Sequence, residues 1–271
     1  MPRLSAGGRA RTDAGHRRLP TGGAAARCHS ARMLSRWTRR AFGALAAALA
    51  AGAASRAQDR RMFTLYTFGD SILDCARYND RGVHPGQLLV RNDDALFPEF
   101  KGRDLASLRP ARLEHRAVDG ATVEGLPSQS RGLAADDNGV ALLTVGGNDL
   151  LRGLAADTGR GVRQFESRLN AFLENLRVRP VLIGTVYDPT FGDDRNNFLG
   201  VDPRIARANH RRVNDVLAAA AARHGALVDV HAHFLTGDPS WYVHTIEPSL
   251  RGASEVRRAF LPQVLARAGA R

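Results

Sequence analysis

Residues 63–71, with the sequence FTLYTFGDS, decide the fold. The first six are aromatic or β-branched apart from one leucine, which is typical of a buried strand, and Gly69-Asp70 then signals a turn. A serine at a strand-to-helix turn is exposed at the edge of the sheet, where the N–H groups of the next helix can stabilise an oxyanion. Ser71 is also an ordinary helix N-cap residue, so this tripeptide alone leaves both interpretations open.

Outward from this strand, apolar strands and amphipathic helices alternate along the chain. Further strands are predicted at 112–118, 140–145, 181–186 and 227–230, and helices at 162–176, 202–223 and 253–266. This alternation predicts one doubly wound α/β domain, with a parallel sheet covered on both faces. Ligands of such sheets bind beyond the carboxyl ends of the strands, so residues at the strand ends are the candidate site.

Two other strand ends carry polar turns. The strand at 140–145 ends in Gly146-Gly147-Asn148-Asp149, where a side-chain amide can donate a hydrogen bond to an oxyanion. The strand at 112–118 precedes Asp119-Gly120-Ala121-Thr122, where a glycine lets its N–H approach a substrate closely. Both segments are also ordinary turn chemistry, so the combination with Ser71 is what indicates a site.

This combination resembles the SGNH (GDSL) hydrolase family, over essentially all of residues 62–266. The segment FGDSILD at 68–74 is similar to the nucleophile block of that family, which places Ser71 as the nucleophile. The segment GGND places Asn148 in the oxyanion hole, and Gly120 matches the oxyanion-hole glycine. The resemblance implies a flavodoxin-like three-layer α/β/α sandwich. It also implies ester hydrolysis through an acyl-serine, with no metal or other cofactor.

The last block of the family pattern is altered. The family usually ends with Asp-x-x-His, often followed by proline, whereas residues 241–249 read WYVHTIEPS. An alignment on Pro248 puts Glu247 in place of the histidine and His244 in place of the aspartate. An alignment of His244 with the histidine puts Trp241 at the acid position instead. In both alignments the usual dyad is not intact.

Three interpretations of this block remain open. Serine needs a general base, and histidine, with a pKa of about 6.5, suits neutral pH better than glutamate at about 4.3. His244 can be the base with Glu247 orienting it, or Glu247 can be the base with His244 as its partner. Alternatively, the site is impaired and the fold binds a carbohydrate or acyl ligand. We expect a serine esterase or acylhydrolase for a lipid ester or an acetylated sugar, with the non-catalytic binding protein as the alternative.

The positive charge of the chain lies ahead of this domain. The 271 residues carry a formal net charge of +12. Residues 1–57 hold eleven arginines and one acidic residue, whereas residues 58–271 hold 28 basic and 26 acidic residues. The surplus therefore does not indicate a polybasic binding domain, and we expect no nucleic-acid partner.

The leader has the order of parts of an export signal. Residues 1–32 are expected to be disordered or a mis-annotated extension, because they show no apolar periodicity. From Met33, a charged region precedes the apolar run 41–54, and Ser55-Arg56-Ala57 forms a small-residue cleavage site. Arg39-Arg40 resembles a twin-arginine signal.

The apolar run is too short for a confident transmembrane span, and an amphipathic or buried helix is the alternative. We therefore expect export by the twin-arginine machinery to a bacterial periplasm or beyond. In that case residues 33–57 are the signal peptide, and residues 58–271 are the hydrolase domain, without a stable membrane span.

Several other residues have two interpretations each. Cys75 is expected to be a packed hydrophobic residue rather than a nucleophile. His84 is expected in a solvated loop at 79–102, with a substrate groove as the alternative. His231 and His233 have a spacing seen in zinc sites, although alternation along a strand end explains it equally. Three arginines near the last helix are expected at the surface, with an anionic substrate as the alternative: Arg251, Arg257 and Arg258. The loops at 79–102 and 189–200 are expected to shape specificity.

Overall fold

The computed structural model describes residues 62–269, which form an α/β fold around a five-stranded parallel sheet. The strands lie in the order β2-β1-β3-β4-β5, and every neighbouring pair is parallel. This is the flavodoxin-like order, in which the chain changes direction beside the first strand. The strands are β1 (Phe63–Gly69), β2 (Ala111–His115), β3 (Gly139–Thr144), β4 (Val181–Gly184) and β5 (Gly225–Val228).

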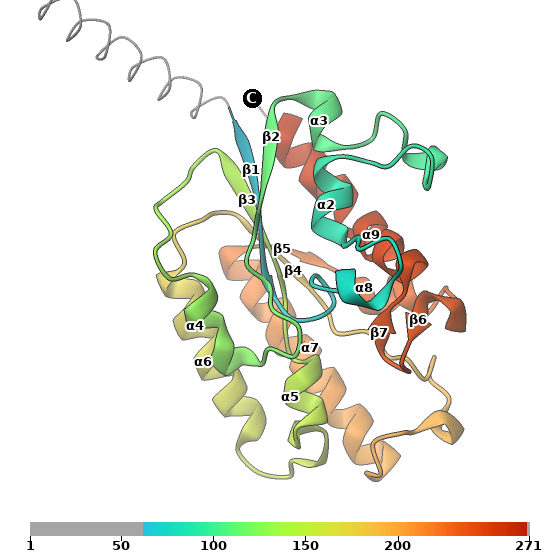
Figure 1. Cartoon of the computed structure of the whole chain (residues 1–271). Helices are drawn as coiled ribbons and strands as arrows, with labels where there is room; N and C mark the ends of the chain where they lie inside the picture. The colour runs from blue at the N-terminus through green and yellow to red at the C-terminus, as the bar shows by residue number, and fades with distance from the viewer. Residues whose placement is uncertain (1–61, 270–271) are drawn as a thin grey trace, which may run out of the picture. The chain divides into compact units, whose positions relative to one another are not determined.

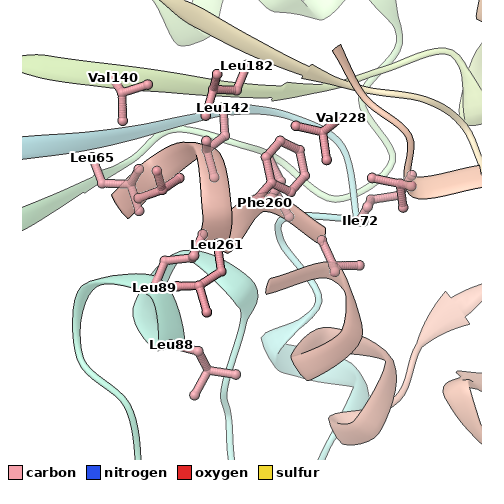
Figure 2. Packing of buried hydrophobic residues seen from close by; sticks show 14 of the residues in the cluster. Leu65, Ile72, Leu88, Leu89, Val140, Leu142, Leu182, Val228, Phe260 and Leu261 are labelled. Carbon is pink, nitrogen blue, oxygen red and sulfur yellow. The ribbon is translucent and has the colours of Figure 1, made fainter. Parts of the chain in front are cut away.

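One face of the sheet is covered by helices that are far apart in sequence. Figure 1 shows α9 beside α2, with α3 and α8 on the same side of the sheet. Side chains from α2 and α9 meet those of the strands in one apolar cluster, in which Leu89 and Phe260 pack with Leu65 and Leu142 (Figure 2). The helices of this layer are α2 (Pro85–Val90), α3 (Leu105–Leu108), α8 (Val230–Phe234) and α9 (Leu250–Gly269).

The other face is covered by α6 and α7, whose apolar sides pack on the sheet (Figure 1). Phe165 and Phe172 of α6 lie in one cluster with Phe68 and Leu143 of the sheet. The two faces together confirm the three-layer sandwich. The helices on this side are α4 (Leu126–Gln129), α5 (Gly147–Leu151), α6 (Gly161–Asn175) and α7 (Pro203–His224).

The prediction of one long loop at 79–102 is wrong, because this segment contains α2. Pro85 occupies the first turn of the helix, where its missing N–H costs nothing, and the Gln87 side chain accepts a hydrogen bond from the His84 N–H. Leu88 and Leu89 are buried against α9. The prediction failed because Gly, Pro, Asn and Asp are abundant in this segment and are typical of loops, although a short buried helix lies among them.

A short antiparallel hairpin was not predicted. It consists of β6 (Tyr242–Val243) and β7 (Glu247–Pro248), and Val243 pairs with Glu247. The hairpin leads directly into α9 and is bound to the end of β4 by the Tyr187 hydroxyl, which donates to the Ile246 carbonyl at 2.6 Å. Residues 242–248 therefore form a hairpin that is held against the segment after β4.

The expected extension, signal peptide and twin-arginine pair lie outside the described residues. Between residues 62 and 269, no helix is both long enough and apolar enough to cross a membrane.

Candidate active site

Ser71 lies directly beyond β1, at the carboxyl edge of the sheet. Gly69 has φ +118, and a Cβ there would lie 1.7 Å from the Thr144 carbonyl oxygen, so only glycine lets β1 and β3 end so close together. The Asp70 N–H donates to the same carbonyl at 3.1 Å. These contacts hold the serine at a fixed place beside the end of β3.

The carboxyl of Asp70 anchors the turn from inside. It accepts hydrogen bonds from the Thr144 hydroxyl at 2.8 Å and from the Ile72 N–H at 3.2 Å. Burial raises the pKa of Asp70 to about 7, and the Thr144 hydrogen bond opposes that rise. Asp70 is thus a buried support of the nucleophile turn.

Two backbone N–H groups and one side-chain amide, from the segments that follow β1, β2 and β3, are the candidate oxyanion donors. Among the described residues, the backbone N–H groups of Ser71 and Gly120 have no hydrogen-bond acceptor. Asn148 lines the same pocket as Ser71 and donates through Nδ2 to the Ala121 carbonyl at 3.1 Å. An amide carries two N–H donors, so one remains for a ligand. The Val118 N–H donates to the Gly69 carbonyl at 2.9 Å, which brings the Gly120 turn beside the serine.

Glu247 is the acidic side chain that reaches Ser71. Burial raises the pKa of Glu247, and a hydrogen bond with the Ser71 side chain opposes the rise. The nearby Asp119 carboxylate raises the pKa further, and His244 lowers it. The Oε2 atom of Glu247 is buried and has no hydrogen-bond partner. Ser71 and the half-buried carboxyl of Glu247 are therefore the two neighbouring side chains at the centre of the candidate site.

His244 lies in the turn of the hairpin and is exposed. Both His244 and Thr245 have positive φ, at 48° and 72°, as in tight hairpin turns. The imidazole packs edge-on against Tyr78, with ring centroids 5.8 Å apart, and among the described residues it makes no hydrogen bond to Ser71 or Glu247. The structure thus brings together Ser71 and Glu247, with His244 at the periphery.

A polar network next to the site was not found from the sequence. Asp119 accepts a hydrogen bond from the Tyr78 hydroxyl at 2.8 Å and forms an ion pair with Arg77 at 3.0 Å. Its own N–H donates to Asp74 at 2.9 Å. This network fixes the residue before Gly120 and the aromatic ring under His244. The position of Asp119 next to Gly120 was a sequence signal for it, whereas Tyr78 had none.

His84 lies neither in a solvated loop nor in a groove. Its ring is buried and stacks on His115, with centroids 4.0 Å apart, and burial lowers the pKa of His84 to about 4. His115 in turn contacts the Thr67 hydroxyl at 2.7 Å and Asp74 at 3.2 Å. Both interpretations of His84 are wrong, because α2 carries the residue into the core.

The other histidines and Cys75 have separate surroundings. His231 lies in α8 and its ring is 4.9 Å from that of His210, whereas His233 contacts Glu255 at 2.9 Å. The spacing of His231 and His233 therefore arises from a helix, not from a strand end. Across residues 62–269, no group of three or more His, Cys, Asp and Glu residues is arranged to hold a metal ion. Cys75 is fully buried, which confirms the prediction of a packed side chain.

The prediction of a surface position is wrong for one of the three arginines near the last helix, Arg257. Arg257 is fully buried, and its guanidinium lies 4.7 Å and 3.4 Å from the ring centroids of Phe97 and Phe100. Arg257 is neither a surface residue nor a substrate contact, because the segment after α2 covers its side chain. Arg251 pairs with Asp238 at the surface, and Arg258 pairs with Glu255 and Glu99.

Residues 67–253 match the GDSL-like lipase/acylhydrolase family. The chain belongs to this family. Members of this GDSL-like family are serine hydrolases that act on esters, which agrees with the placement of Ser71 at the end of β1. The family match covers all the residues that meet at the site.

Solved structures with the fold of this GDSL-like chain include known hydrolases. An α/β hydrolase enzyme from the metagenome of Lake Arreo, Spain, is 25% identical with a TM-score of 0.52, and the match covers 76% of this chain and 94% of that chain. An acetylxylan esterase from Geobacillus stearothermophilus is 20% identical with a TM-score of 0.55, covering 74% and 93%. No curated protein matches the sequence.

A pocket opens beside Ser71 in this GDSL-like chain. It lies between α5, the first turns of α7 and the segment 186–199. Residues of the segment 189–200 line this pocket, whereas residues 79–102 do not contribute to it. That these loops shape specificity stays a prediction. The sequence did not predict the pocket walls that α5 and α7 contribute. Their apolar side chains have the spacing of ordinary buried helix positions, so nothing marked them as pocket residues.

Proposed function

We propose that the protein is an exported serine esterase or acylhydrolase that hydrolyses a carboxylic ester through an acyl-serine, with Glu247 as the general base. One observation carries the proposal: the Glu247 carboxyl lies close enough to the Ser71 side chain for that side chain to lower its pKa, and within residues 62–269 the N–H groups of Ser71 and Gly120 have no acceptor. A nucleophile in reach of a base, next to preorganised donors, is the arrangement that acyl transfer needs.

The first half of the reaction forms the acyl-enzyme. Glu247 takes the proton from the Ser71 hydroxyl as Oγ attacks the acyl carbon. The N–H groups of Ser71 and Gly120 and the Nδ2 group of Asn148 donate to the oxyanion. When the intermediate collapses, the bond to the alcohol breaks, and the alcohol takes the proton from protonated Glu247.

The second half releases the acid. A water molecule gives a proton to Glu247 and its oxygen attacks the acyl carbon of the ester on Ser71. The same donors stabilise the second oxyanion. The bond to Ser71 Oγ then breaks, the serine recovers its proton from Glu247, and the carboxylic acid leaves.

A glutamate can serve here because of its surroundings. An exposed carboxylate is a weak base, but burial and the neighbouring Asp119 raise the pKa of Glu247 toward the range where proton transfer from serine is easier. The charge of His244 acts in the opposite direction and lowers the pKa of Glu247. In this scheme Glu247 is the base, and His244 acts on it only through its charge.

The comparisons support an ester as the substrate, since the family comprises lipases and acylhydrolases and one similar fold is that of an acetylxylan esterase. Export rests on residues 33–57, with their charged region, apolar run and cleavage site. The twin-arginine machinery is the proposed partner, because Arg39-Arg40 precedes the apolar run.

A serine-reactive fluorophosphonate probe tests the proposal. We expect Ser71 to be labelled and Ser71→Ala to abolish labelling. On a short-chain p-nitrophenyl ester, Glu247→Gln should lower kcat by about 10²- to 10⁴-fold, the usual contribution of a general base. His244→Ala should have an effect of less than about tenfold.

Two results would count against it. A folded protein that takes no label but binds a glycan or lipid would support the non-catalytic binding protein instead. Undiminished rates in both Glu247→Gln and His244→Ala would remove the dyad from the mechanism even if Ser71 is labelled.

A further inference from the structure

The pocket beside Ser71 is elongated along the edge of the sheet. It begins at Ser71 after β1, passes Asn148 after β3, and continues to Val186 after β4. In the sheet order these strands are consecutive neighbours, so the pocket spans two strand spacings. Adjacent strands lie about 4.8 Å apart, which gives a length of roughly 10 Å. An acetyl group would occupy only the end next to the serine.

The walls beyond Ser71 and Asn148 are largely apolar. They come from α5 and the turn after it, the end of β4, the 189–200 segment, α7 and the hairpin. The apolar wall residues include Leu150, Ala155, Val186, Leu199, Ala206 and Ile246. A sugar ring in such a pocket would leave most of its hydroxyl groups without hydrogen-bond partners, which is unfavourable.

The basic residues of the pocket already have partners within the protein. Arg207 contacts Asp188 at 3.1 Å and Asp194 at 2.5 Å, so its charge is balanced within the protein. The His210 Nε2 contacts the Val186 carbonyl at 2.8 Å. These groups therefore close one side of the pocket and do not offer a free cation to an anionic ligand.

The mouth is apolar as well. Leu151 and Phe198 both line the pocket, and they are 40% and 42% exposed. Large apolar side chains that remain in water beside an apolar pocket are typical of a ligand-binding groove. They extend the apolar surface from the interior to the entrance.

We propose that this pocket holds the acyl chain of the substrate, and that the acyl group is a medium-length alkyl chain rather than acetyl. The inference deepens the proposed function and rests on it, because it names the acyl side of the ester that Ser71 attacks. An alkyl chain fits a pocket roughly 10 Å long with apolar walls, and each buried methylene adds about 0.8 kcal/mol of binding, equivalent to about fourfold.

A chain-length series on the full chain tests this inference. For p-nitrophenyl acetate, butyrate and octanoate, kcat/KM should rise by up to about fourfold per added methylene. Ala206→Phe narrows the pocket from α7 and should lower the octanoate-to-acetate ratio of kcat/KM by at least about tenfold. Ala219→Phe, at an exposed position of the same helix, is the matched control and should leave the ratio unchanged.

A binding measurement separates this inference from the proposed function. Calorimetry with octanoate and the Ser71→Ala protein should detect binding, and Ala206→Phe added to that protein should weaken it. Octanoate binding without hydrolysis of any ester supports the acyl pocket and refutes the esterase. Acetate hydrolysis with a flat chain-length series and no octanoate binding overturns the acyl pocket and leaves the esterase intact.

Discussion

At the scale of single residues, Glu247 and His244 have opposite surroundings. Glu247 is half-buried beside Ser71, whereas His244 is exposed in a turn of positive φ. With Glu247 as the proposed base, the pH dependence of the reaction should follow a carboxyl group and not an imidazole.

The pH dependence of the hydrolysis depends on which residue is the general base. A general base must be deprotonated, so kcat/KM of the native protein should fall as the pH drops through the raised pKa of Glu247. The double variant His244→Asp/Glu247→His restores the usual residue types. Its acidic limb should lie at higher pH, near the imidazole pKa of about 6.5.

Profiles of log kcat/KM against pH on p-nitrophenyl acetate measure both limbs. Glu247→Gln is the control, because an amide does not titrate and its residual rate should lack this limb. The same limb in the native protein and in the double variant would show that a different group is the base.

At the scale of elements, α9 is joined to the segment after α2 by a buried arginine. Arg257 stacks against Phe97 and Phe100 and donates to the Asn92 side chain at 2.7 Å. Burial lowers the pKa of Arg257 to about 10, so the guanidinium remains charged at neutral pH. Gly252 has a related role, since a Cβ there would lie 2.0 Å from the Trp241 carbonyl oxygen and would push α9 away from the hairpin.

Removal of this arginine should destabilise the fold strongly. Arg257→Ala deletes the buried stacking and leaves the Asn92 oxygen without its donor, so we expect a loss of about 3 kcal/mol or more in the free energy of unfolding. The neighbouring Arg258→Ala removes partly exposed ion pairs and should cost less than about 1 kcal/mol. Denaturant unfolding of both variants makes the comparison, and equal losses would refute the structural role of Arg257.

At the scale of the whole molecule, the charge of the chain divides at the proposed cleavage site. Residues 1–57 carry nearly all the surplus of positive charge, and residues 58–271 are close to neutral. Long-range attraction to polyanions depends on such a surplus, so it should belong to the leader and not to the hydrolase domain.

Truncation tests this division. A chain that begins at residue 58 should be labelled by fluorophosphonate as well as the full chain, and should melt within about 3 °C of it, which corresponds to roughly 1 kcal/mol. It should leave a heparin column at low salt, whereas the full chain should need more salt. Equal retention of both chains would place a polyanion-binding surface on residues 58–271.

What the sequence determined by itself is the sheet and the residues at its edge. Runs such as 63–68 and 140–145 are buried strands, and their glycine turns at Gly69 and Gly146 put Ser71 and Asn148 at the carboxyl edge. These features depend on local composition and spacing, which a sequence displays directly. The tertiary structure decided which side chain lies beside Ser71, where the pocket opens, and that Arg257 is buried. Glu247 reaches Ser71 through the hairpin and its Tyr187 hydrogen bond, the pocket walls come from several separate segments, and Arg257 is enclosed by residues near Phe100. Each of these is a contact between segments far apart in the chain, and only the packing of α9 and the hairpin against the sheet brings them together.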